Sequence, residues 1–510
     1  MNQAPVTRTF SEENFFAAYK QIRNQFRKYS PHSIVNKAFD YLKIPTSSSI
    51  DDLQKHPWLV FLLLKWVLLD EQFYSRDKRN ISKQEFETLL NKMHGLGSKS
   101  IVRMPSEYAH FHLWMRNISY QQFLYQNTFN GSAFARQSLL FDKLAHNHTF
   151  RIDFERITSF PLSDFFELSA MLLLRFMEGN NVAVEISWFS PVKDRYDKSI
   201  VQRFLDFLSC DLEALRNYLI EEAGNKKLRS SEYYEETLLV KFPLLKVDNV
   251  YHLWHPMLLN RGLEYAVYET LRTPNPSNFM KMFGGIFEAY VNRSIQHLGL
   301  PYLAEKQIQQ WLGNTQKVTD FLITEDGANI FVDAKGVEIA YLGKVSHNPE
   351  IVLDKVETSA LKGIEQGFQV AHYLSTQNAI NPPFQASNEN YLLIVTFKEL
   401  YLGSGKDFYE AVAKEKINAF VGAEESFPIP LENIYFITVD DLDQVANFVK
   451  KGKVKFVEML RKIVFEDQSA NTKKFHFRQH LFEFWAGSGN PQYIDEEIES
   501  IFGRVQDLLS

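Results

Sequence analysis

The chain has 510 residues, a formal net charge of −6 and a single cysteine, Cys210. At about 100–200 residues per domain, this length predicts about two to four domains. The net negative charge excludes a globally basic nucleic-acid-binding protein, although a local basic groove is compatible with it. One cysteine excludes an intramolecular disulfide and a cysteine-based zinc site, and it fits a reducing compartment.

The first half of the chain has the apolar spacing of helices, for example in residues 11–26 and 82–93. Short extended pieces are expected within it, for example at 182–187 and 238–242. The most apolar run, residues 58–69, would form a helix about 18 Å long, against a hydrocarbon core of about 30 Å. We therefore expect a buried helix there, no membrane partner, and an all-α region over residues 1–272.

The segment TPNPS, residues 273–277, interrupts this pattern, because its prolines and Asn disfavour a helix. After it, helical and strand-like patterns alternate. We expect a helix from Met280 to Leu298, strands at Ala304–Ile308, Lys317–Thr324 and Asn329–Lys335, a helix near Lys355–Leu374, strands at Tyr391–Phe397 and Ile434–Val439, and one long helix from about Asp441 into Ile463. This order predicts an α/β domain with a mixed sheet over residues 273–470. A helical tail follows over residues 471–510.

One stretch of this domain, KVTDFLITEDGANIFVDAKG, predicts a β-hairpin with charged residues on one face. Asp326-Gly327 is a typical two-residue turn, because both residues tolerate positive φ. With this loop, Asp320 faces Asp333 directly, and such partners have Cβ atoms about 4.5–5.5 Å apart. Period-two alternation places Lys335 on the same face as Asp333. The hairpin therefore brings two carboxylates and one ammonium together.

Two adjacent carboxylates repel each other, and a divalent cation removes this conflict. Hard cations such as Mg²⁺ or Mn²⁺ prefer carboxylate oxygens, water and phosphate oxygens. A metal held by Asp320 and Asp333 would stabilise charge on a phosphoryl oxygen and help to activate a water. Lys335 would position or activate that water, or neutralise the phosphate.

The sequence Asp320…Asp333-Ala334-Lys335 resembles the D…(D/E)-x-K signature of the PD-(D/E)XK nuclease superfamily. Members of this superfamily share a core of helix, three strands, helix and strand, written αβββαβ, and the resemblance covers roughly residues 277–439. It implies that Asp320 and Asp333 are metal ligands, that the Ala334 carbonyl is a third ligand, and that Lys335 is catalytic. Thr319 stands where the family name has proline.

Two further features resemble this superfamily. An acidic residue often lies on the helix before the strands, and Glu288 fits that position. Gln369-Val370-Ala371-His372-Tyr373 is similar to the Q-x-x-x-Y motif of the exonuclease-like, RecB-type branch. Gln369 and Tyr373 share one helix face with Lys362 and Gln366. This polar stripe would contact phosphates and stack on a base of a nucleic acid.

The resemblance predicts a cytoplasmic, bacterial-type nuclease that depends on Mg²⁺ or Mn²⁺ and hydrolyses phosphodiester bonds. DNA is the favoured substrate, and RNA, including tRNA, stays open. We expect residues 1–272 to sense a trigger, such as a protein, or to restrain the active site. Helical regions joined to such nuclease domains recur among bacterial anti-phage defence proteins, so antiviral defence is expected by analogy of architecture.

Two alternatives from other functional classes remain open. The domain could bind nucleic acid without cutting it, or the helical half could be a protein-interaction module with a degenerate nuclease attached. Two smaller features also have two interpretations. The cations among residues 450–462 form either part of a nucleic-acid channel or a solvated surface, and His252 with His255 form either a metal pair or, as we expect, packing residues.

Overall fold

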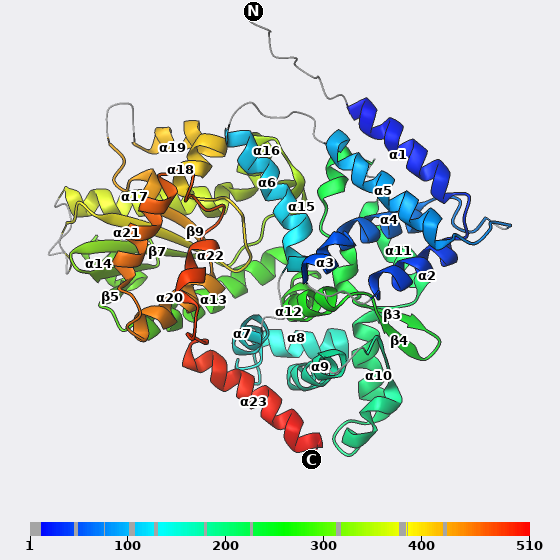
Figure 1. Cartoon of the computed structure of the whole chain (residues 1–510). Coiled ribbons are helices and arrows are strands. Elements are labelled where there is room, and N and C mark those ends of the chain that lie inside the picture. Colours follow the sequence, from blue (N-terminus) through cyan, green and yellow to red (C-terminus); the bar gives the residue numbers. More distant parts are fainter. Residues whose placement is uncertain are drawn as a thin grey trace, which may run out of the picture. The chain divides into compact units, whose positions relative to one another are not determined.

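The computed structural model describes residues 12–44, 49–75, 77–100, 108–126, 131–177, 181–224, 228–312, 318–376, 384, 386–421 and 426–509. The protein is α+β, about 66% helical, with two sheets of mixed strand direction (Figure 1). It divides into two compact units. Unit 1 contains Met1–Pro105, Asn117–Leu271 and Glu499–Ser510, and unit 2 contains Ser106–Arg116 and Arg272–Ile498.

Unit 1 is built mainly from helices with buried apolar faces. These are α1 (Glu12–Phe26), α2 (Pro31–Leu42), α3 (Ser49–Gln54), α4 (Pro57–Leu69), α5 (Lys83–Ser100), the second part of α6 (Tyr108–Gln122), α7 (Gly131–Phe141), α8 (Thr149–Thr158), α9 (Leu162–Met177), α10 (Lys198–Phe207), α11 (Leu212–Ala223), α12 (Pro256–Arg272, its last residue in unit 2) and the end of α23 (Gln492–Leu509). The apolar run 58–69 is helix α4, as predicted. Its lysine, Lys65, forms ion pairs with Glu232 and Glu235.

Unit 1 also contains a small sheet, so the all-α description of the first half is wrong in this respect, whereas the extended piece expected near 182–187 is present as a strand. Its strands are β1 (Ala183–Glu185), β2 (Ser209–Cys210), β3 (Leu244–Val247) and β4 (Val250–Leu253), in the order β1-β4-β3-β2. Strands β3 and β4 form a hairpin whose turn begins at Asp248, with φ of 53°. The residues around 238–242 form a short 3₁₀ helix, Leu238–Lys241, because Pro243 separates them from β3. These strands have two to four residues each, which is too short for a clear alternation signal.

Within the described residues, no single helix has both the length and the apolar character needed to cross a membrane. Helices α8 and α9, bent by 60° at the break between them, meet those two criteria only when they are taken together. Most of α9 is buried within unit 1, including Phe165, Phe166 and Leu172, each fully inaccessible to solvent. A soluble core helix meets the same criteria, so this finding does not identify a membrane segment.

Unit 2 is organised around a five-stranded sheet in the order β5-β6-β7-β8-β9. The strands are β5 (Tyr302–Ala304), β6 (Phe321–Glu325), β7 (Ala328–Lys335), β8 (Asn390–Thr396) and β9 (Ile434–Thr438). The first three strands are antiparallel neighbours, whereas β7, β8 and β9 are parallel. The predicted mixed sheet is therefore present, and every residue of β8 and β9 is buried, which explains their continuous apolar sequences.

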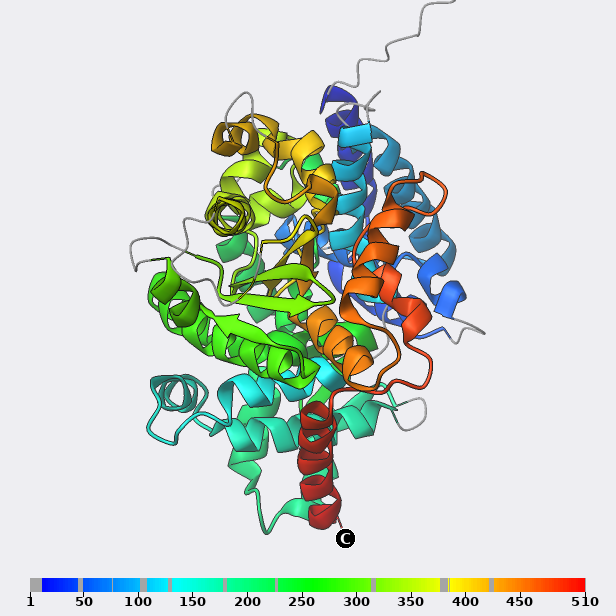
Figure 2. The ribbon, with the colours of Figure 1, turned by 90° about the vertical axis from the view of Figure 1, so that its left-hand side faces the viewer.

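Helices cover both faces of this sheet. Figure 2 shows α13 (Pro276–Leu298) on one side and α17 (Lys362–Ser375) on the other. The remaining helices of the unit are the first part of α6, α14 (Glu305–Trp311), α15 (Tyr341–Val345), α16 (Pro349–Val356), α18 (Gly405–Phe408), α19 (Lys414–Val421), α20 (Val439–Lys450), α21 (Phe456–Asp467), α22 (Arg478–Leu481) and the start of α23. The predicted order of helix, three strands, helix and strand is present as α13, β5, β6, β7, α17 and β8, with α14 inserted between β5 and β6 and with α15 and α16 inserted between β7 and α17.

Two predicted elements of unit 2 differ from the structure. The expected strand Ala304–Ile308 ends at Ala304, where the backbone N–H donates to the side chain of Gln307 and helix α14 begins. The expected long helix 441–463 is two helices, α20 and α21. The break contains Gly452 with φ of 66°, a left-handed conformation that ends a helix and that glycine adopts at little cost.

Candidate active site

The hairpin β6–β7 has the predicted register. Glu325 pairs with Ala328 and Phe321 pairs with Val332. The loop between them is Asp326-Gly327, with φ of 49° and 81°, as a tight turn with two left-handed residues requires. Counting outward by one residue from the last pair places Asp320 opposite Asp333, so the predicted register of the hairpin is confirmed.

Asp320 lies at the residue before β6 and is held by the next strand. The backbone N–H of Ala334 donates to Oδ2 of Asp320 over 2.6 Å. Burial, followed by the negative charge of Asp333, raises the pKa of Asp320 to about 8. The hydrogen bond from Ala334 therefore holds this carboxyl group in place, while burial and the neighbouring Asp333 disfavour its charged form.

Asp333 is fully buried in the middle of the sheet, between β6 and β8. Its Oδ2 lies 2.6 Å from Nζ of Lys335. Among the residues that the structure describes, neither oxygen of Asp333 accepts a hydrogen bond of normal geometry. Burial raises the pKa of Asp333, and the ammonium of Lys335 acts in the opposite direction. A buried carboxylate with so few partners is unusual in a native fold.

Lys335 is anchored by a second side chain. Its Nζ donates to Oε1 of Gln366 over 3.0 Å, and Nε2 of Gln366 donates to the carbonyl of Val318 over 2.8 Å. Gln366 is only 8% exposed. The prediction that Gln366 contacts nucleic acid is therefore replaced by a different role, because both ends of its amide are engaged inside the protein.

The other residues of the predicted stripe lie on the same helix, α17. Lys362 is the first residue of α17 and precedes Gly363, which lies against the carboxyl group of Asp333, and its positive charge acts to lower the pKa of that group. Gln369 and Tyr373 follow Gln366 by one and two turns of α17 and are half-buried. Their side chains are thus partly accessible to a ligand, and their predicted contact with nucleic acid stays a prediction.

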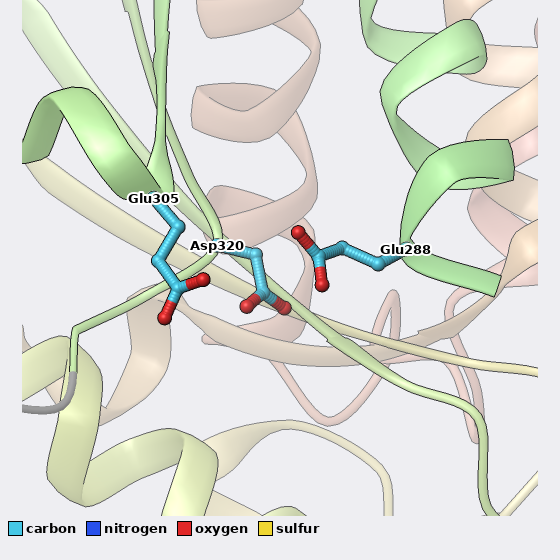
Figure 3. A group of neighbouring side chains, drawn as sticks. All are labelled: Glu288, Glu305 and Asp320. Atoms are coloured by element: carbon cyan, nitrogen blue, oxygen red, sulfur yellow. The ribbon is translucent and has the colours of Figure 1, made fainter. Parts of the chain in front are cut away.

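Glu288 and Glu305 complete the acidic group, and Glu305 was not predicted from the sequence. Figure 3 shows Glu288 of α13, Glu305 at the start of α14 and Asp320 pointing toward one another. One carboxylate oxygen of each lies within 4.8 Å of those of the other two. Burial, then the charges of Glu305 and Asp333, raises the pKa of Glu288. Glu305 was overlooked because its segment was predicted as a strand; an acidic residue directly after a strand was the only signal.

Two other predicted features have structural explanations. Most of the cations in residues 450–462 bind within unit 2: Lys451 and Lys453 donate to Ser488, and Arg461 forms an ion pair with Glu389. They are therefore not a set of free phosphate contacts. His255 packs against Phe61 and Tyr125 in unit 1, and burial lowers its pKa to about 4, which agrees with the expected packing role.

The donor set fits a hard divalent cation. It offers carboxylate oxygens only, and the buried Asp333 beside it is ion-paired with the ammonium of Lys335. It contains no thiolate or imidazole among these residues, so the site has no preference for a soft metal. No protein-family model, no curated protein and no solved structure matches this chain. Its function is therefore inferred from the chemistry of these side chains.

Proposed function

We propose that this chain is a metal-dependent nuclease that hydrolyses phosphodiester bonds, with DNA as the favoured substrate. The observation that supports this most directly is the cross-strand opposition of Asp320 and Asp333, with Lys335 ion-paired beside them. The order of α13, β5, β6, β7, α17 and β8 supports a PD-(D/E)XK-type core, because it is the order that such a core would have.

Asp320, Asp333 and the carbonyl of Ala334 would hold Mg²⁺ or Mn²⁺. When bound, such an ion stabilises negative charge on phosphoryl oxygens and lowers the pKa of a coordinated water. The Ala334 N–H keeps the Asp320 carboxylate turned toward the site. Gln366 holds the Lys335 ammonium near Asp333, where it would orient an attacking water or neutralise the phosphate.

The role of the rest of the chain follows as part of the same proposal. Lys362, Gln369 and Tyr373 would guide the nucleic-acid strand along α17 toward the carboxylates. Uncontrolled hydrolysis would damage the host cell, so the helical unit 1 would sense a trigger or restrain the site. An anti-phage defence effector is the setting that this combination fits by analogy.

Cleavage of plasmid DNA, linear DNA and total tRNA by the full chain, with Mg²⁺, Mn²⁺ or EDTA, tests the proposal. We expect cutting that requires the metal and falls at least 100-fold in Asp333→Asn and in Lys335→Ala, on the scale of losing one catalytic group. Glu432→Gln, an exposed position of unit 2, is the matched control and should cut normally.

If the protein cuts none of these substrates, the wild type and Asp333→Asn are compared for toxicity in cells and for nucleic-acid binding. Toxicity of the wild-type chain in cells, abolished by Asp333→Asn, would support a nuclease that awaits its trigger. Nucleic-acid binding that is equal in wild type and Asp333→Asn, without toxicity, would contradict the proposal and favour a binding scaffold.

A further inference from the structure

A buried arginine of unit 1, Arg216, has almost no partners for its guanidinium. It lies on α11, which packs against α4 (Figure 1). The residue is only 8% exposed. Within the described residues, its Nε and Nη1 are buried and donate no hydrogen bond, and its Nη2 has one long contact, 3.4 Å from the carbonyl of Asp70. Arginine stays charged and carries five N–H donors, so this cation is largely unsatisfied.

The carboxylates near this contact are bound to a different arginine. Nε of Arg27 donates to both carboxylate oxygens of Asp70 over 3.0 Å, and its Nη2 donates to Glu71 over 2.7 Å. Among the residues that the structure describes, no carboxylate forms an ion pair with Arg216. A buried charge without a counter-ion disfavours the folded state, so a bound anion would supply the partner that the chain lacks.

Two aromatic rings enclose the guanidinium of Arg216. Its Cζ lies 5.2 Å from the ring centroids of both Phe73 and Tyr74. Such rings attract a cation, but they do not accept hydrogen bonds from N–H groups in the guanidinium plane. The rings therefore account for the position of Arg216 and not for its unused donors. Phe73 is buried, whereas Tyr74 is 63% exposed, so the Tyr74 side chain can turn aside without unpacking a core.

A second cation lies at the same turn, residues 70–75. Nζ of Lys78 donates to the carbonyl of Gln72 over 2.7 Å, and burial lowers the pKa of Lys78. In the part of the chain that the structure describes, Lys78 likewise forms no ion pair with a carboxylate. Two cations that bind only backbone carbonyls of one turn favour a ligand with more than one negative charge. A phosphate group has this charge and several acceptor oxygens.

We propose that Arg216, Lys78 and Tyr74 form a binding site for the phosphate group of a small molecule. Arg216 is its main contact, because the arginine fork matches two phosphate oxygens. The exposed ring of Tyr74 would stack on a base of the same molecule, so a nucleotide fits the site better than inorganic phosphate does. None of these residues belongs to the D…D-x-K or the Q-x-x-x-Y sequence. A role of this ligand as the trigger of unit 1 rests on the proposed function, whereas its binding does not.

Isothermal titration calorimetry of the full chain with inorganic phosphate and with AMP tests the inference. EDTA is present, so that no metal-bound nucleotide at the hairpin contributes heat. We expect one site per chain, with an affinity for both probes that falls at least about tenfold in Arg216→Met and in Arg216→Lys, because neither variant has the fork. Arg203→Met, at an exposed position of α10 in the same unit, is the matched control and should bind as the wild type does.

The two probes distinguish a nucleotide from free phosphate. AMP that binds more tightly than phosphate, and loses at least about fivefold in affinity in Tyr74→Ala, would support a nucleotide. Equal affinities for the two probes, both dependent on Arg216, would support a site for the phosphate group alone. The absence of heat from either probe at millimolar concentration, or affinities that are unchanged in Arg216→Met, would overturn the inference.

Thermal unfolding distinguishes a binding residue from a packing residue. Without ligand, Arg216→Met should melt at or above the temperature of the wild type, because an apolar side chain replaces a charge that has no counter-ion. Phosphate should raise the melting temperature of the wild type and of Arg203→Met, but not that of Arg216→Met. If Arg216→Met does not fold, Lys78→Met, at a half-buried position, must lose the same stabilisation by phosphate. A phosphate-induced shift in Arg216→Met equal to that of the wild type would overturn the inference.

Cleavage assays on the same proteins separate this inference from the proposed function. Phosphate or AMP binding with the expected variant pattern, but no cleavage or toxicity, would support the site in unit 1 and contradict the nuclease. Metal-dependent cleavage by a protein that binds neither probe would support the nuclease and overturn the phosphate site.

Discussion

Gly363 of α17 lies directly against the buried carboxylate of Asp333: a Cβ atom at position 363 would be 2.8 Å from Oδ2 of Asp333 and 3.0 Å from Cδ1 of Ile394. Glycine is therefore required at 363 by a close approach of the helix to the sheet, and its own backbone needs no special φ. The same helix approaches β8 at Gly367, where a Cβ would lie 2.8 Å from Leu392. The two glycines together determine how near α17, with Gln366, comes to β7 and β8.

The Gly363→Ala variant tests this relationship. We expect it to push Asp333 aside, to weaken Mn²⁺ binding at least tenfold, and to destabilise the protein by about 1–3 kcal/mol, as overpacking of a core does. Urea denaturation and Mn²⁺ titration measure the two effects. Gly503→Ala in α23, where no atom lies within 4 Å of the new Cβ, is the matched control and should be neutral or slightly stabilising. Unchanged metal affinity in Gly363→Ala would show that Asp333 does not bind the ion.

The hairpin could be predicted from sequence because its geometry is local. The two residues Asp326-Gly327 determine the loop length, and the loop length determines which residues face each other. Strands β8 and β9 were also predicted, since their continuous apolar sequences are typical of buried parallel strands.

Contacts between segments distant in the sequence were not predictable in the same way. The hydrogen bond from Gln366 to the carbonyl of Val318 joins residues that are 48 positions apart. No local pattern distinguishes Gln366, which points inward, from Gln369 on the same helix. Glu305 gained its place only because α14 begins where a strand had been expected. The contacts of His112 and Arg116 with Tyr401 and Leu400 in unit 2 likewise join distant segments that a one-dimensional pattern does not connect.

Gln366 and Gln369 are predicted to differ in what they do. Gln366 positions Lys335, so Gln366→Leu should lower kcat about 10–100-fold and leave KM for nucleic acid nearly unchanged. Gln369 is half-buried on the accessible part of the stripe, so Gln369→Ala should raise KM and change kcat little. Steady-state kinetics on a short labelled DNA measure both. Equal effects of the two variants on KM would contradict the internal role of Gln366.

Glu399 predicts a pH dependence of stability that is separate from the active site. Its Oε1 accepts hydrogen bonds from the N–H groups of Leu400 and Tyr401, and burial, followed by the charge of Asp441, raises its pKa to about 7. Between about pH 4.5 and 7 the unfolded chain loses a proton that the folded chain keeps. The contribution of Glu399 to the free energy of unfolding therefore falls over this range and is smallest above pH 7.

Glu399→Gln keeps an acceptor oxygen and removes this titration. We expect it to stabilise the protein by about 1–2 kcal/mol at pH 8 and by much less at pH 4.5, where the folded chain carries the neutral acid and about half of the unfolded chains still do. The side chain is 21% exposed, so water reduces the effect below the full value of the pKa shift. Denaturant titrations at both pH values measure it, with Glu432→Gln as an exposed control. A stabilisation that is the same at both pH values would contradict the raised pKa.

Removal of the helical region at residue 272 is predicted to damage unit 2 itself. Helix α6 contributes Arg116 to this unit, with a side chain that is fully buried. Its Nε donates to the carbonyl of Leu400 over 3.0 Å, and its Nη1 donates to the carbonyl of Gly343. Nε2 of His112 also lies 3.3 Å from the carbonyl of Tyr401. A chain that begins at Thr273 loses all these contacts.

Each buried carbonyl left without a donor costs about 1–3 kcal/mol, so the fragment 273–510 should be less stable than the same unit in the full chain by several kcal/mol, or should aggregate. Arg116→Met in the full chain isolates the cause and should destabilise unit 2 by about 3–5 kcal/mol, as the loss of a buried charged donor does. Denaturant titration followed by hydrogen exchange at Leu400 and Tyr401 measures both. An equal unfolding midpoint for the fragment and the full chain would contradict this prediction. Because of these contacts, a loss of activity after truncation at 272 does not by itself show that residues 1–272 regulate the site.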